Sequence, residues 1–263
     1  MTVPDYNFSK KVVLITGASS GIGLHLSKCF AEAGARVAVM ARSKDKLYNL
    51  CAEIAKEGGE ARPFPADVQD ESLVESQISA VVHRFGKLNI IVHCAGITRK
   101  GFLQDLSTPD WDAIIDTNLK SAYYLAKHSH YHLHDAAGEE HSKFILIGSV
   151  GSFFGIPLSA AYCASKGGLV QLMRSLAVEW AEDGINVNAI CPGYILTPLS
   201  ESVLKIGDTY KKVASRIPMR KIGNTSDIAN AALFFCSPMA DYIQGATLNV
   251  DGGLMSAAYT LDE

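Results

Sequence analysis

The sequence predicts a doubly wound α/β fold, in which a parallel β-sheet is covered by helices on both faces. Short runs of β-branched and other apolar residues alternate with longer amphipathic segments, which is the rhythm of repeated β-α-β units. The runs are so uniformly apolar that both faces of the sheet must be covered, which favours parallel strands. Gly17, Gly21 and Gly23 stand between the first run and the segment after it, where such folds turn from strand to helix.

The individual elements follow one another without interruption. Strands are expected at residues 11–16, 35–40, 61–66, 88–93, 143–148, 185–190 and 246–250, the third of them weak. Helices are expected at residues 21–33, 43–57, 70–85 and about 109–134, then around Tyr162 and Lys166, and at about 226–237. No internal repeat, low-complexity tract or proline-rich linker breaks this series, so residues 1–263 are expected to form a single domain.

Composition narrows the classes of partner and location. With 263 residues, of which 48% are hydrophobic and 19% charged, the chain is long enough to bury a large core. A net charge of -3 provides no basic surface for nucleic acid or an anionic membrane. The six cysteines are widely spaced without a C-x-x-C pair, which favours free thiols in a reducing compartment and a cytoplasmic location. The N-terminal apolar run, VVLI, is too short for a signal peptide or a membrane span.

The glycine-rich turn TGASSGIG, at residues 16–23, predicts a nucleotide site. Glycines here let the backbone approach a pyrophosphate, and the free N–H groups at the start of the next helix attract negative charge. No Lys-Ser or Lys-Thr pair follows the glycines, so the turn is not a P-loop. The alternative is that the glycines serve only a tight turn and close helix packing.

Tyr162 and Lys166 are four residues apart in a predicted helix, so their side chains lie about 40° apart around its axis. Lowering the pKa of tyrosine from about 10 to about 7 takes roughly 4 kcal/mol. The electrostatic energy between a phenolate and an ammonium about 4 Å away, at an effective dielectric constant near 20, is of that order. Such a tyrosine can give a proton to a carbonyl oxygen or take one from an alcohol. The alternative is a surface tyrosine beside a solvated lysine.

Gly167 and Gly168 follow the lysine inside the predicted helix. Each glycine costs the helix about 1 kcal/mol of stability, which is tolerable if another part of the protein packs closely there.

Together these motifs make the whole chain resemble the short-chain dehydrogenase/reductases. The matching segments are the turn at 16–23, Asp67 and Val68, HCAG at 93–96, DTNLKS with Asn118, LIGSVGS with Ser149, YCASK with Tyr162 and Lys166, and CPGYILTP at 191–198. The resemblance implies a Rossmann-type fold, a nicotinamide cofactor, and hydride transfer between that cofactor and a carbonyl or carbinol carbon. It also implies a homodimer or homotetramer in which the helix of Tyr162 packs against its counterpart, which would explain the two glycines.

The resemblance assigns roles to individual residues. Its catalytic residues are Asn118, Ser149, Tyr162 and Lys166. Its cofactor-binding residues are Gly17, Ser19, Ser20, Gly21, Ile22, Gly23, Asp67, Val68, Ala95, Gly96, Tyr162, Lys166, Pro192, Gly193, Ile195 and Thr197. Tyr162 is the implied general acid or base, and Ser149 would hold the substrate oxygen, with Ser152 as the nearby alternative. Lys166 would bind the nicotinamide ribose, and Asn118 would orient a water that links the lysine to solvent.

His93 and Cys94 depart from the family pattern, which usually has two asparagines at these positions. The usual tasks of those asparagines are to brace the central sheet and to line the adenosine ribose pocket. Much of the ribose contact is made by the backbone in the family, so cofactor binding is expected to survive the change.

Arg42 is the residue that bears on cofactor choice. An acidic residue after the second strand grips the ribose 2′-hydroxyl of NAD, whereas an arginine accommodates the 2′-phosphate of NADP. Here Ala41 stands where the acid would be and Arg42 follows it, so NADP(H) is favoured over NAD(H). The alternative is that Arg42 is a solvated charge like Lys44 and Lys46.

Two further segments bear on which substrate the protein binds. Arg99 and Lys100 follow the fourth strand at the carboxyl edge of the sheet and suggest a carboxylate or hydroxyl-rich substrate. Their loop resembles that of the gluconate 5-dehydrogenase branch, which implies a keto-sugar, sugar acid or polyol. Residues 198–219 are expected to form a mobile lid. Its apolar residues are Leu199, Val203, Leu204, Ile206 and Tyr210.

Two other functions remain open on the sequence alone. One is reduction of 3-oxoacyl groups on an acyl carrier protein, and the other is a non-catalytic, dinucleotide-binding regulatory protein. A metal site is not expected, although histidines gather near residue 130. The pairs His128/His132 and His130/His134 point to opposite sides of their helix, and neither is aligned with a third ligand.

Overall fold

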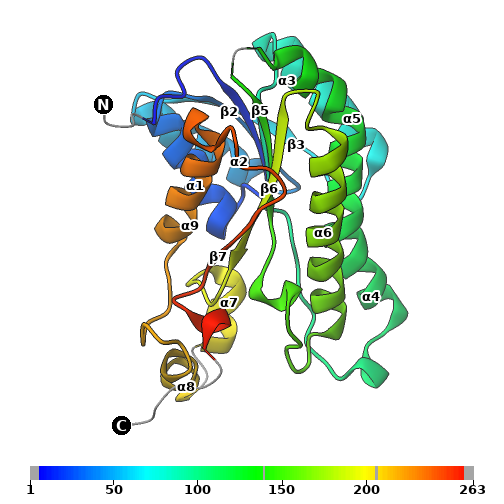
Figure 1. Ribbon diagram of the computed structural model, residues 1–263, viewed down its shortest axis with the longest axis vertical. Helices are drawn as coiled ribbons and strands as arrows, with labels where there is room; N and C mark the ends of the chain where they lie inside the picture. Colours follow the sequence, from blue (N-terminus) through cyan, green and yellow to red (C-terminus); the bar gives the residue numbers. More distant parts are fainter. Residues whose placement is uncertain (1–5, 139, 205–206, 258–263) are drawn as a thin grey trace.

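Seven strands form one parallel sheet in the computed structural model, which describes residues 6–138, 140–204 and 207–257. The strands are β1 (Val12–Thr16), β2 (Arg36–Ala41), β3 (Glu60–Pro65), β4 (Ile90–His93), β5 (Ser142–Ile147), β6 (Ile185–Pro192) and β7 (Thr247–Val250). Their order across the sheet is β3-β2-β1-β4-β5-β6-β7, and every neighbouring pair is parallel. Figure 1 shows the strands between helices that lie on either side of them. All seven strands expected from the sequence are confirmed, and the weak one, β3, lies at the edge of the sheet, where its prolines are tolerated.

The chain changes direction across the sheet between β1 and β4. It runs outward from β1 to β3, returns to pair β4 with the other side of β1, and then continues outward to β7. In register, Thr16 at the end of β1 is the partner of His93 at the end of β4. Ligands of such sheets bind at the carboxyl ends of the strands at this reversal point. The glycine-rich turn after β1 therefore opens into the expected crevice.

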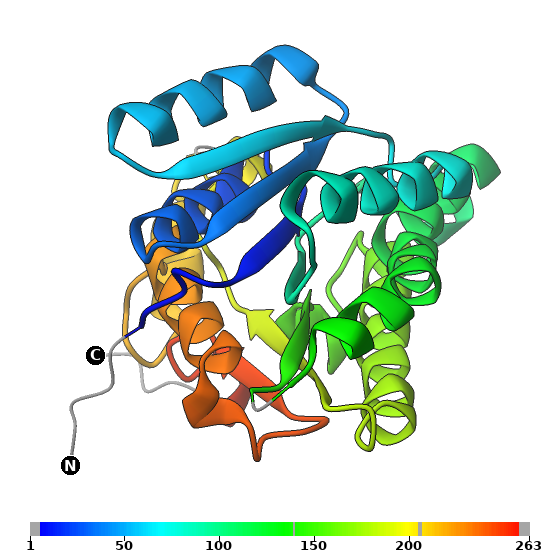
Figure 2. The same ribbon diagram turned by 90° about the horizontal axis from the view of Figure 1, so that it is seen from above.

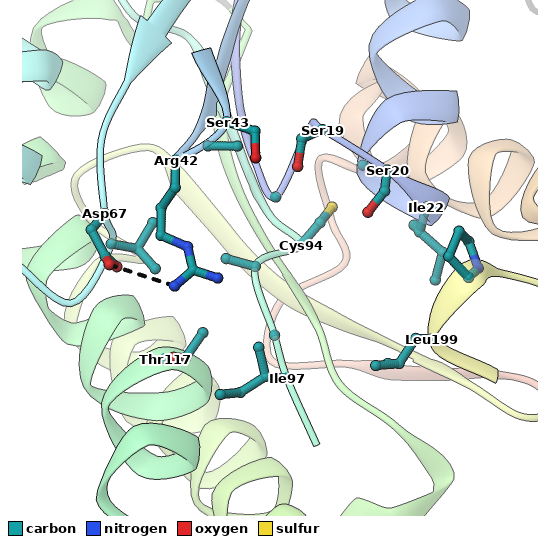
Figure 3. Close-up of a pocket in the computed structure, with 18 of the residues that line it drawn as sticks. Ser19, Ser20, Ile22, Arg42, Ser43, Asp67, Cys94, Ile97, Thr117 and Leu199 are labelled. Atoms are coloured by element: carbon teal, nitrogen blue, oxygen red, sulfur yellow. Dashed lines mark ion pairs between the residues drawn. The ribbon is translucent and has the colours of Figure 1, made fainter. Parts of the chain in front are cut away.

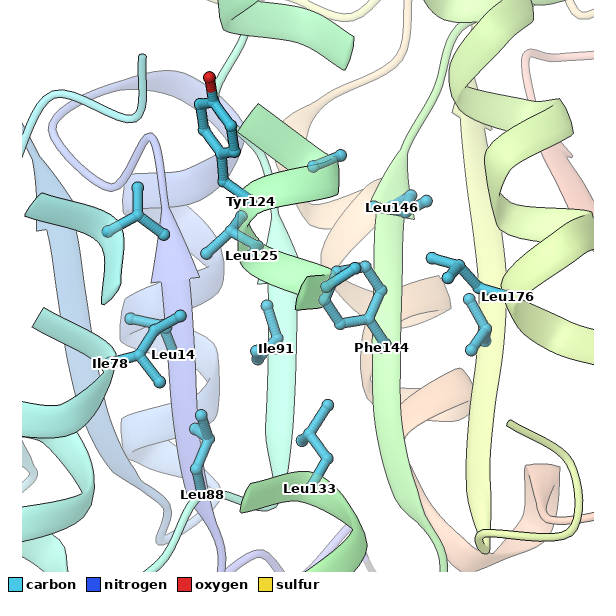
Figure 4. Close-up of a cluster of buried hydrophobic side chains, with 14 of the residues drawn as sticks. Leu14, Ile78, Leu88, Ile91, Tyr124, Leu125, Leu133, Phe144, Leu146 and Leu176 are labelled. Carbon is cyan, nitrogen blue, oxygen red and sulfur yellow. The ribbon is translucent and has the colours of Figure 1, made fainter. Parts of the chain in front are cut away.

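Helices cover both faces of the sheet, as the uniformly apolar strands predict (Figure 2). One face carries α1 (Gly21–Glu32), α2 (Lys44–Lys56) and α9 (Thr225–Cys236), and the other carries α3 (Glu71–Phe85), α5 (Ser121–Ala136) and α6 (Ala160–Glu179). The core between the sheet and the second group is drawn in Figure 4, where Phe144 on β5 lies among leucines and isoleucines from strands and helices. The doubly wound, single-domain α/β architecture is thus confirmed.

The helix boundaries reflect local side-chain chemistry. Asp70 accepts a hydrogen bond from the backbone N–H of Leu73 and so begins α3, which ends at Gly86 with a φ of 82°. Asn224 and Asp227 form a reciprocal capping box at the start of α9. For both helices, the boundaries expected from the sequence lie within about one residue of the observed ones.

The long helix expected at about 109–134 is interrupted. It consists of α4 (Thr108–Ile115), a π-helical turn at Asp116–Lys120, and α5. A π-helical turn widens the helix by one residue and is frequent at functional sites. Asn118 lies at the centre of this turn, which the apolar periodicity of the sequence does not reveal.

The remaining elements are short. They are α7 (Pro198–Leu204), α8 (Thr209–Ser215) and four 3₁₀ turns, at Leu103–Asp105, Val150–Ser152, Pro238–Ala240 and Leu254–Ser256. Within the described residues, no helix has both the length and the apolar character needed to cross a membrane.

Candidate active site

The glycine-rich turn brings two backbones into close contact. Gly17 has a φ of +66°, and a Cβ atom there would lie only 2.8 Å from the main-chain nitrogen of Ala95. A Cβ atom on Gly23 would lie 2.6 Å from the carbonyl oxygen of Gly17. Neither position has room for a side chain, so β1, α1 and the segment after β4 can meet only because glycine is present. The turn leaves an open cradle in front of the start of α1.

A cavity of about 300 Å³ lies against this turn. Figure 3 shows Arg42 and Asp67 at one end, Ser19 and Ser20 in the middle, and Leu199 at the other end. Of the predicted cofactor residues, those that line it are Gly17, Ser19, Ser20, Gly21, Ile22, Gly23, Arg42, Asp67, Val68, Ala95, Gly96 and Thr197. Cys94 and Leu199, which the sequence relates to the ribose pocket and to the lid, also line it. Lining residues that the sequence did not indicate include Ser43, Gln69, Ile97 and Thr117.

Arg42 and Asp67 form an ion pair across the end of this cavity. The guanidinium Nη1 lies 3.8 Å from Oδ2 of Asp67, and the Arg42 side chain is 67% exposed (Figure 3). A pair this exposed contributes little to stability, so a stronger anion can replace the carboxylate. Ser43 lines the cavity beside Arg42, and its hydroxyl makes no cap hydrogen bond to α2.

A second cavity, of about 230 Å³, continues from the first. Both are lined by Ile22, Cys94, Gly96, Thr197 and Leu199. The predicted residues found in the second cavity alone are Lys100, Ser149, Tyr162, Lys166, Pro192, Gly193 and Ile195. An elongated ligand in the first cavity therefore reaches the side chains expected to do chemistry in the second.

Tyr162 and Ser149 face each other in the second cavity. Both side chains line this cavity, and the Ser149 hydroxyl is close enough to lower the pKa of the phenol. The Ser149 hydroxyl also accepts a 3.0 Å hydrogen bond from the backbone N–H of Gly151. The alternative serine, Ser152, donates its hydroxyl proton to the main-chain oxygen of Lys166 instead. The structure thus places Ser149, and not Ser152, next to the phenol.

Lys166 is buried beside Tyr162, with its Nζ 5.9 Å from the centre of the phenol ring. The ammonium donates a 2.7 Å hydrogen bond to the main-chain oxygen of Ile147. Burial lowers the pKa of Lys166 from its usual 10.5 to about 8, because few groups compensate for the lost water. Two of its three donor positions remain for other partners.

The pKa of Tyr162 is not lowered in this structure, contrary to the expectation from the sequence. Burial raises the pKa of the phenol, and the neighbouring Ser149 hydroxyl opposes that rise only in part. The ammonium of Lys166 lies over the phenol ring, 5.9 Å from its centre, and donates its hydrogen bond to the main-chain oxygen of Ile147. Burial thus favours the protonated form of Tyr162, which can act as a proton donor.

Asn118 lines neither cavity but lies directly behind them. Its Oδ1 accepts from the backbone N–H of Ile97 at 2.8 Å, and its Nδ2 donates to the Ile97 oxygen at 3.0 Å and to Ser165 at 3.0 Å. A Cβ atom at Gly96 would lie 3.4 Å from Oδ1 of Asn118 and 3.5 Å from Nζ of Lys166. The absence of a side chain at Gly96 leaves these two groups facing a common space.

Gly168 has a neighbour within the same chain. A Cβ atom there would lie 2.9 Å from Cδ2 of Leu119, which belongs to the π-helical turn. The helix of Tyr162 and Lys166 thus packs closely on the turn that carries Asn118. Gly167 has no such restriction, since a Cβ atom there would lie 3.6 Å from the nearest atom, the oxygen of Ser152.

Lys100 and Arg99 have different surroundings although they are adjacent. Lys100 lines the second cavity. Arg99 lines neither cavity, and its Nε lies 3.5 Å from Oδ1 of Asp110 on α4. Of the two proposed substrate contacts, the structure brings only Lys100 to the cavity.

The segment expected to form a lid contains α7 and α8. Leu199 and Leu204 line the second cavity, and Leu204 packs against Ile217 and Ile222. Tyr210 is about half exposed. Ile206 lies outside the described residues, as does the side chain of Val203. The described part of the segment covers one wall of the second cavity.

Two histidines of α5 lie within hydrogen-bond distance of carboxylates from other parts of the chain. His128 lies 2.9 Å from Oε1 of Glu71, and His130 lies 2.8 Å from Oδ2 of Asp183. Across residues 6–138, 140–204 and 207–257, no group of three or more His, Cys, Asp or Glu side chains is arranged to hold a metal ion.

Comparison with known proteins agrees with this geometry. The family model described as enoyl-(acyl carrier protein) reductase matches residues 17–255. A 3-oxoacyl-[acyl-carrier-protein] reductase, FabG, of Staphylococcus aureus is 37% identical over 247 residues, which cover 93% of this chain and 98% of that protein.

Two solved structures are similar over almost their whole length. A gluconate 5-dehydrogenase from Burkholderia cenocepacia J2315, in complex with NADP and tartrate, is 32% identical with a TM-score of 0.91, covering 97% of this chain and 98% of that one. A short-chain type dehydrogenase/reductase from Mycobacterium marinum is also 32% identical, with a TM-score of 0.89, covering 96% of this chain and 98% of that one.

Proposed function

This chain belongs to the short-chain dehydrogenase/reductase family and is an oxidoreductase, and we propose that it interconverts a ketone and a secondary alcohol with NADP(H). One observation carries the proposal: Tyr162, Ser149 and Lys166 converge on a cavity that continues from the glycine-rich turn. The first cavity fits an extended nucleotide, and the second fits the reacting end of the cofactor together with a substrate.

The residues that would hold the cofactor are those of the cradle. The open backbone at Gly17 and Gly23 and the N–H groups at the start of α1 suit a pyrophosphate. Lys166, with two free donor positions, would bind the ribose next to the nicotinamide. The bound nicotinamide would supply or accept the hydride.

The protein's own side chains would handle the proton. The Ser149 hydroxyl would hold the substrate oxygen next to the phenol of Tyr162, which lines the same cavity. Tyr162 would then donate its proton to the oxygen as the alcohol forms, or remove it in the reverse direction. Lys166 and Asn118 would restore that proton through a water in the space left by Gly96.

NADP(H) is proposed over NAD(H) because of the residues at the end of the first cavity where Arg42 lies. Arg42 follows β2, and Ser43 beside it has a hydroxyl that makes no cap hydrogen bond to α2. The carboxylate that now pairs with Arg42, Asp67, lies 3.8 Å away and is weakly bound. A ribose 2′-phosphate would be a stronger partner for the guanidinium. The relative from Burkholderia cenocepacia was solved with NADP.

The proposed substrate is a keto-sugar, sugar acid or polyol. Lys100 supplies a cation to the second cavity, and Thr98 and Ser159 supply hydroxyl groups. These groups suit a substrate that carries a carboxylate and several hydroxyls. The gluconate 5-dehydrogenase that shares this fold was solved with tartrate, a hydroxylated dicarboxylate.

A second candidate is reduction of 3-oxoacyl thioesters. Apolar side chains line much of the second cavity, among them Ile147, Val150, Ile156 and Leu204. Such walls suit an acyl chain. The relative from Staphylococcus aureus is a 3-oxoacyl-[acyl-carrier-protein] reductase. The third possibility, a dinucleotide-binding protein without activity, requires that the hydroxyl pair of Tyr162 and Ser149 have no chemical use.

One assay separates these functions. Purified protein is mixed with NADPH or NADH and with 5-ketogluconate, related keto-sugars or a 3-oxoacyl thioester, and cofactor oxidation is followed. We expect faster oxidation of NADPH with a keto-sugar than with the thioester. Thioester reduction without keto-sugar activity would favour the second candidate. Cofactor fluorescence that changes on binding, without turnover of any ketone in a broad panel, would favour the regulatory function.

The proposal also covers the oligomeric state of the protein, the movement of the lid and the location in the cell. We propose a homodimer or homotetramer, whose mass in solution can be measured by light scattering. The lid at residues 198–219 would close over the second cavity, since Leu199 and Leu204 already line it. All six cysteines are free thiols, which supports a cytoplasmic location.

A further inference from the structure

His93 is a completely buried histidine at the end of β4, directly behind the candidate site. Its Nδ1 lies 2.9 Å from Oγ1 of Thr16 at the end of β1. Its Nε2 lies 3.2 Å from Oγ of Ser121 at the start of α5. One side chain therefore contacts both the glycine-rich turn and the helix segment that carries Asn118.

The surrounding hydrogen bonds determine which ring nitrogen of His93 carries the proton. Oγ1 of Thr16 accepts from the backbone N–H groups of Cys94 and Ala95, both at 3.2 Å. Both lone pairs of the Thr16 hydroxyl are then used, so its proton must be given to Nδ1 of His93. Nδ1 is consequently the acceptor, and the proton of the neutral ring is on Nε2.

The other side of the ring is consistent with this assignment. The hydroxyl of Ser121 donates its own proton to the main-chain oxygen of Thr117 at 2.6 Å. Ser121 can therefore only accept from Nε2–H of His93. The result is a directed chain of hydrogen bonds from Thr16 through the ring to Ser121 and Thr117. Every donor and acceptor in it has a partner, which is the condition for a rigid buried network.

The charge of the ring is also defined by its surroundings. Burial, and to a lesser extent the ammonium of Lys166, lower the pKa of His93 to about 3, and the Asn118 backbone opposes this only weakly. A protonated ring would lose its acceptor for the Thr16 hydroxyl and would place a second cation near Lys166. The network therefore requires a neutral ring.

We propose that His93 is a positioning residue that couples the cofactor turn to the π-helical turn carrying Asn118, through its neutral Nε2–H form. The ring does not line either cavity and so does not touch substrate or cofactor. Its Thr16 bond fixes the backbone at Cys94 and Ala95 against which the cofactor would lie. Its Ser121 bond fixes the helix segment behind Lys166. The inference rests on the proposed function for the role of Asn118 in restoring the proton.

The two bonds can be removed separately. His93→Asn keeps an oxygen close to the position of Nδ1, which can accept from Thr16, but does not reach Ser121. Ser121→Ala removes the bond between Nε2 and Ser121, together with the bond from Ser121 to the Thr117 oxygen, and leaves the Thr16 bond in place. His93→Leu removes both. Ser129→Ala is the matched control, because Ser129 is also buried on α5 and its hydroxyl has no hydrogen-bond partner among the described residues.

We expect a split between turnover and cofactor affinity. Ser121→Ala and His93→Asn should each lower kcat about tenfold, the change expected for loss of one hydrogen bond of about 1.4 kcal/mol, with an unchanged dissociation constant for NADPH. The double variant should lose no more than Ser121→Ala alone, because that change already removes the bond that His93→Asn removes. His93→Leu should also weaken NADPH binding, and Ser129→Ala should change neither quantity.

The proposal is overturned if Ser121→Ala behaves like Ser129→Ala, or if His93→Asn weakens NADPH binding as much as His93→Leu. Nitrogen NMR of histidine-labelled wild-type protein provides a readout that needs no substrate. The spectrum should show His93 neutral with its proton on Nε2 from about pH 9 down to about pH 5. A proton on Nδ1, or a charged ring in that range, would contradict the network even if no substrate of the protein had been found.

Discussion

The ammonium of Lys166 donates a 2.7 Å hydrogen bond to the main-chain oxygen of Ile147, and the rest of its surroundings are apolar or neutral. Because β5 ends at Ile147, this bond ties the lysine of α6 to the carboxyl edge of the sheet. The ammonium also lies over the Tyr162 ring, 5.9 Å from its centre. Burial is the largest influence on the pKa of both side chains.

The first prediction follows from that burial. In the cofactor-free protein, Lys166 should lose its proton near pH 8, whereas an ordinary lysine titrates at about 10.4. An NMR titration of labelled lysine side chains measures this directly. Lys127, an exposed lysine paired with Glu71, has a raised pKa and serves as the internal control. Co-titration of Lys166 with Lys127 would contradict the described surroundings of Lys166.

Arg42 carries the prediction on cofactor choice. Arg42→Ala should raise the dissociation constant of NADPH roughly tenfold or more, since a hydrogen bond to a charged group is worth about 1.5–3 kcal/mol. Binding of NADH should hardly change, because that cofactor lacks the 2′-phosphate. Both constants can be measured by cofactor fluorescence. Lys46→Ala is the control: it removes the same charge from nearby α2, but Lys46 does not line the cavity. Equal weakening of both cofactors by Arg42→Ala would refute a phosphate contact.

Lys100 and Arg99 give a matched pair for the substrate. Lys100→Ala should raise the KM of an anionic keto-sugar about tenfold with little change in kcat, as expected when a contact is equally strong in the ground state and the transition state. Arg99→Ala removes the same charge from the same loop. It should leave the cavity intact, because Arg99 does not line the cavity and is paired with Asp110 instead. Steady-state kinetics of both variants test the assignment. A larger effect of Arg99→Ala would show that the loop rearranges when substrate binds.

The buried His93 makes a prediction about acid stability. The pKa of His93 is about 3 in the folded protein, against a usual value of 6.5 in the unfolded chain. Below pH 6.5 the unfolded state therefore binds a proton that the folded state does not, so stability falls as the pH drops from 6.5 towards 3. Between about pH 6.5 and about pH 4 this single group should remove about 3 kcal/mol.

Urea denaturation measures that loss. His93→Asn lacks the titrating ring, so its free energy of unfolding should decline less steeply with acid than that of the wild type. His83→Asn, which replaces an exposed histidine on α3, should decline like the wild type. Parallel curves for wild type and His93→Asn would mean that the ring is not buried as a neutral group.

Much of the fold could be predicted because its signals are local. Uniformly apolar runs identified the strands, and the glycine-rich turn identified the point at which β1 passes into α1. The π-helical turn around Asn118 was not predictable, because one additional residue in a helix hardly alters an apolar periodicity. Gly168 gave an indirect signal, since its packing partner, Leu119, lies in that turn.

The site was predictable in its residues but not in its electrostatics. Most of the expected residues line one of the two cavities because their motifs end parallel strands at a common edge. The pKa of Tyr162 depends on where the ammonium of Lys166 points, and that direction is set by a main-chain oxygen on another element. The choice between Arg99 and Lys100 depends on Asp110, which a spacing pattern cannot locate.

Replacement of Tyr162 by phenylalanine tests the central claim most directly. Tyr162→Phe keeps the ring and removes only the hydroxyl of a side chain that lines the second cavity with Ser149. With the ketone that the wild-type enzyme reduces, turnover should fall by about 10²–10⁴-fold, while the dissociation constant for NADPH stays unchanged. Tyr131→Phe, on the exposed side of α5, should retain full turnover. Near-normal turnover of Tyr162→Phe would contradict proton transfer by this residue.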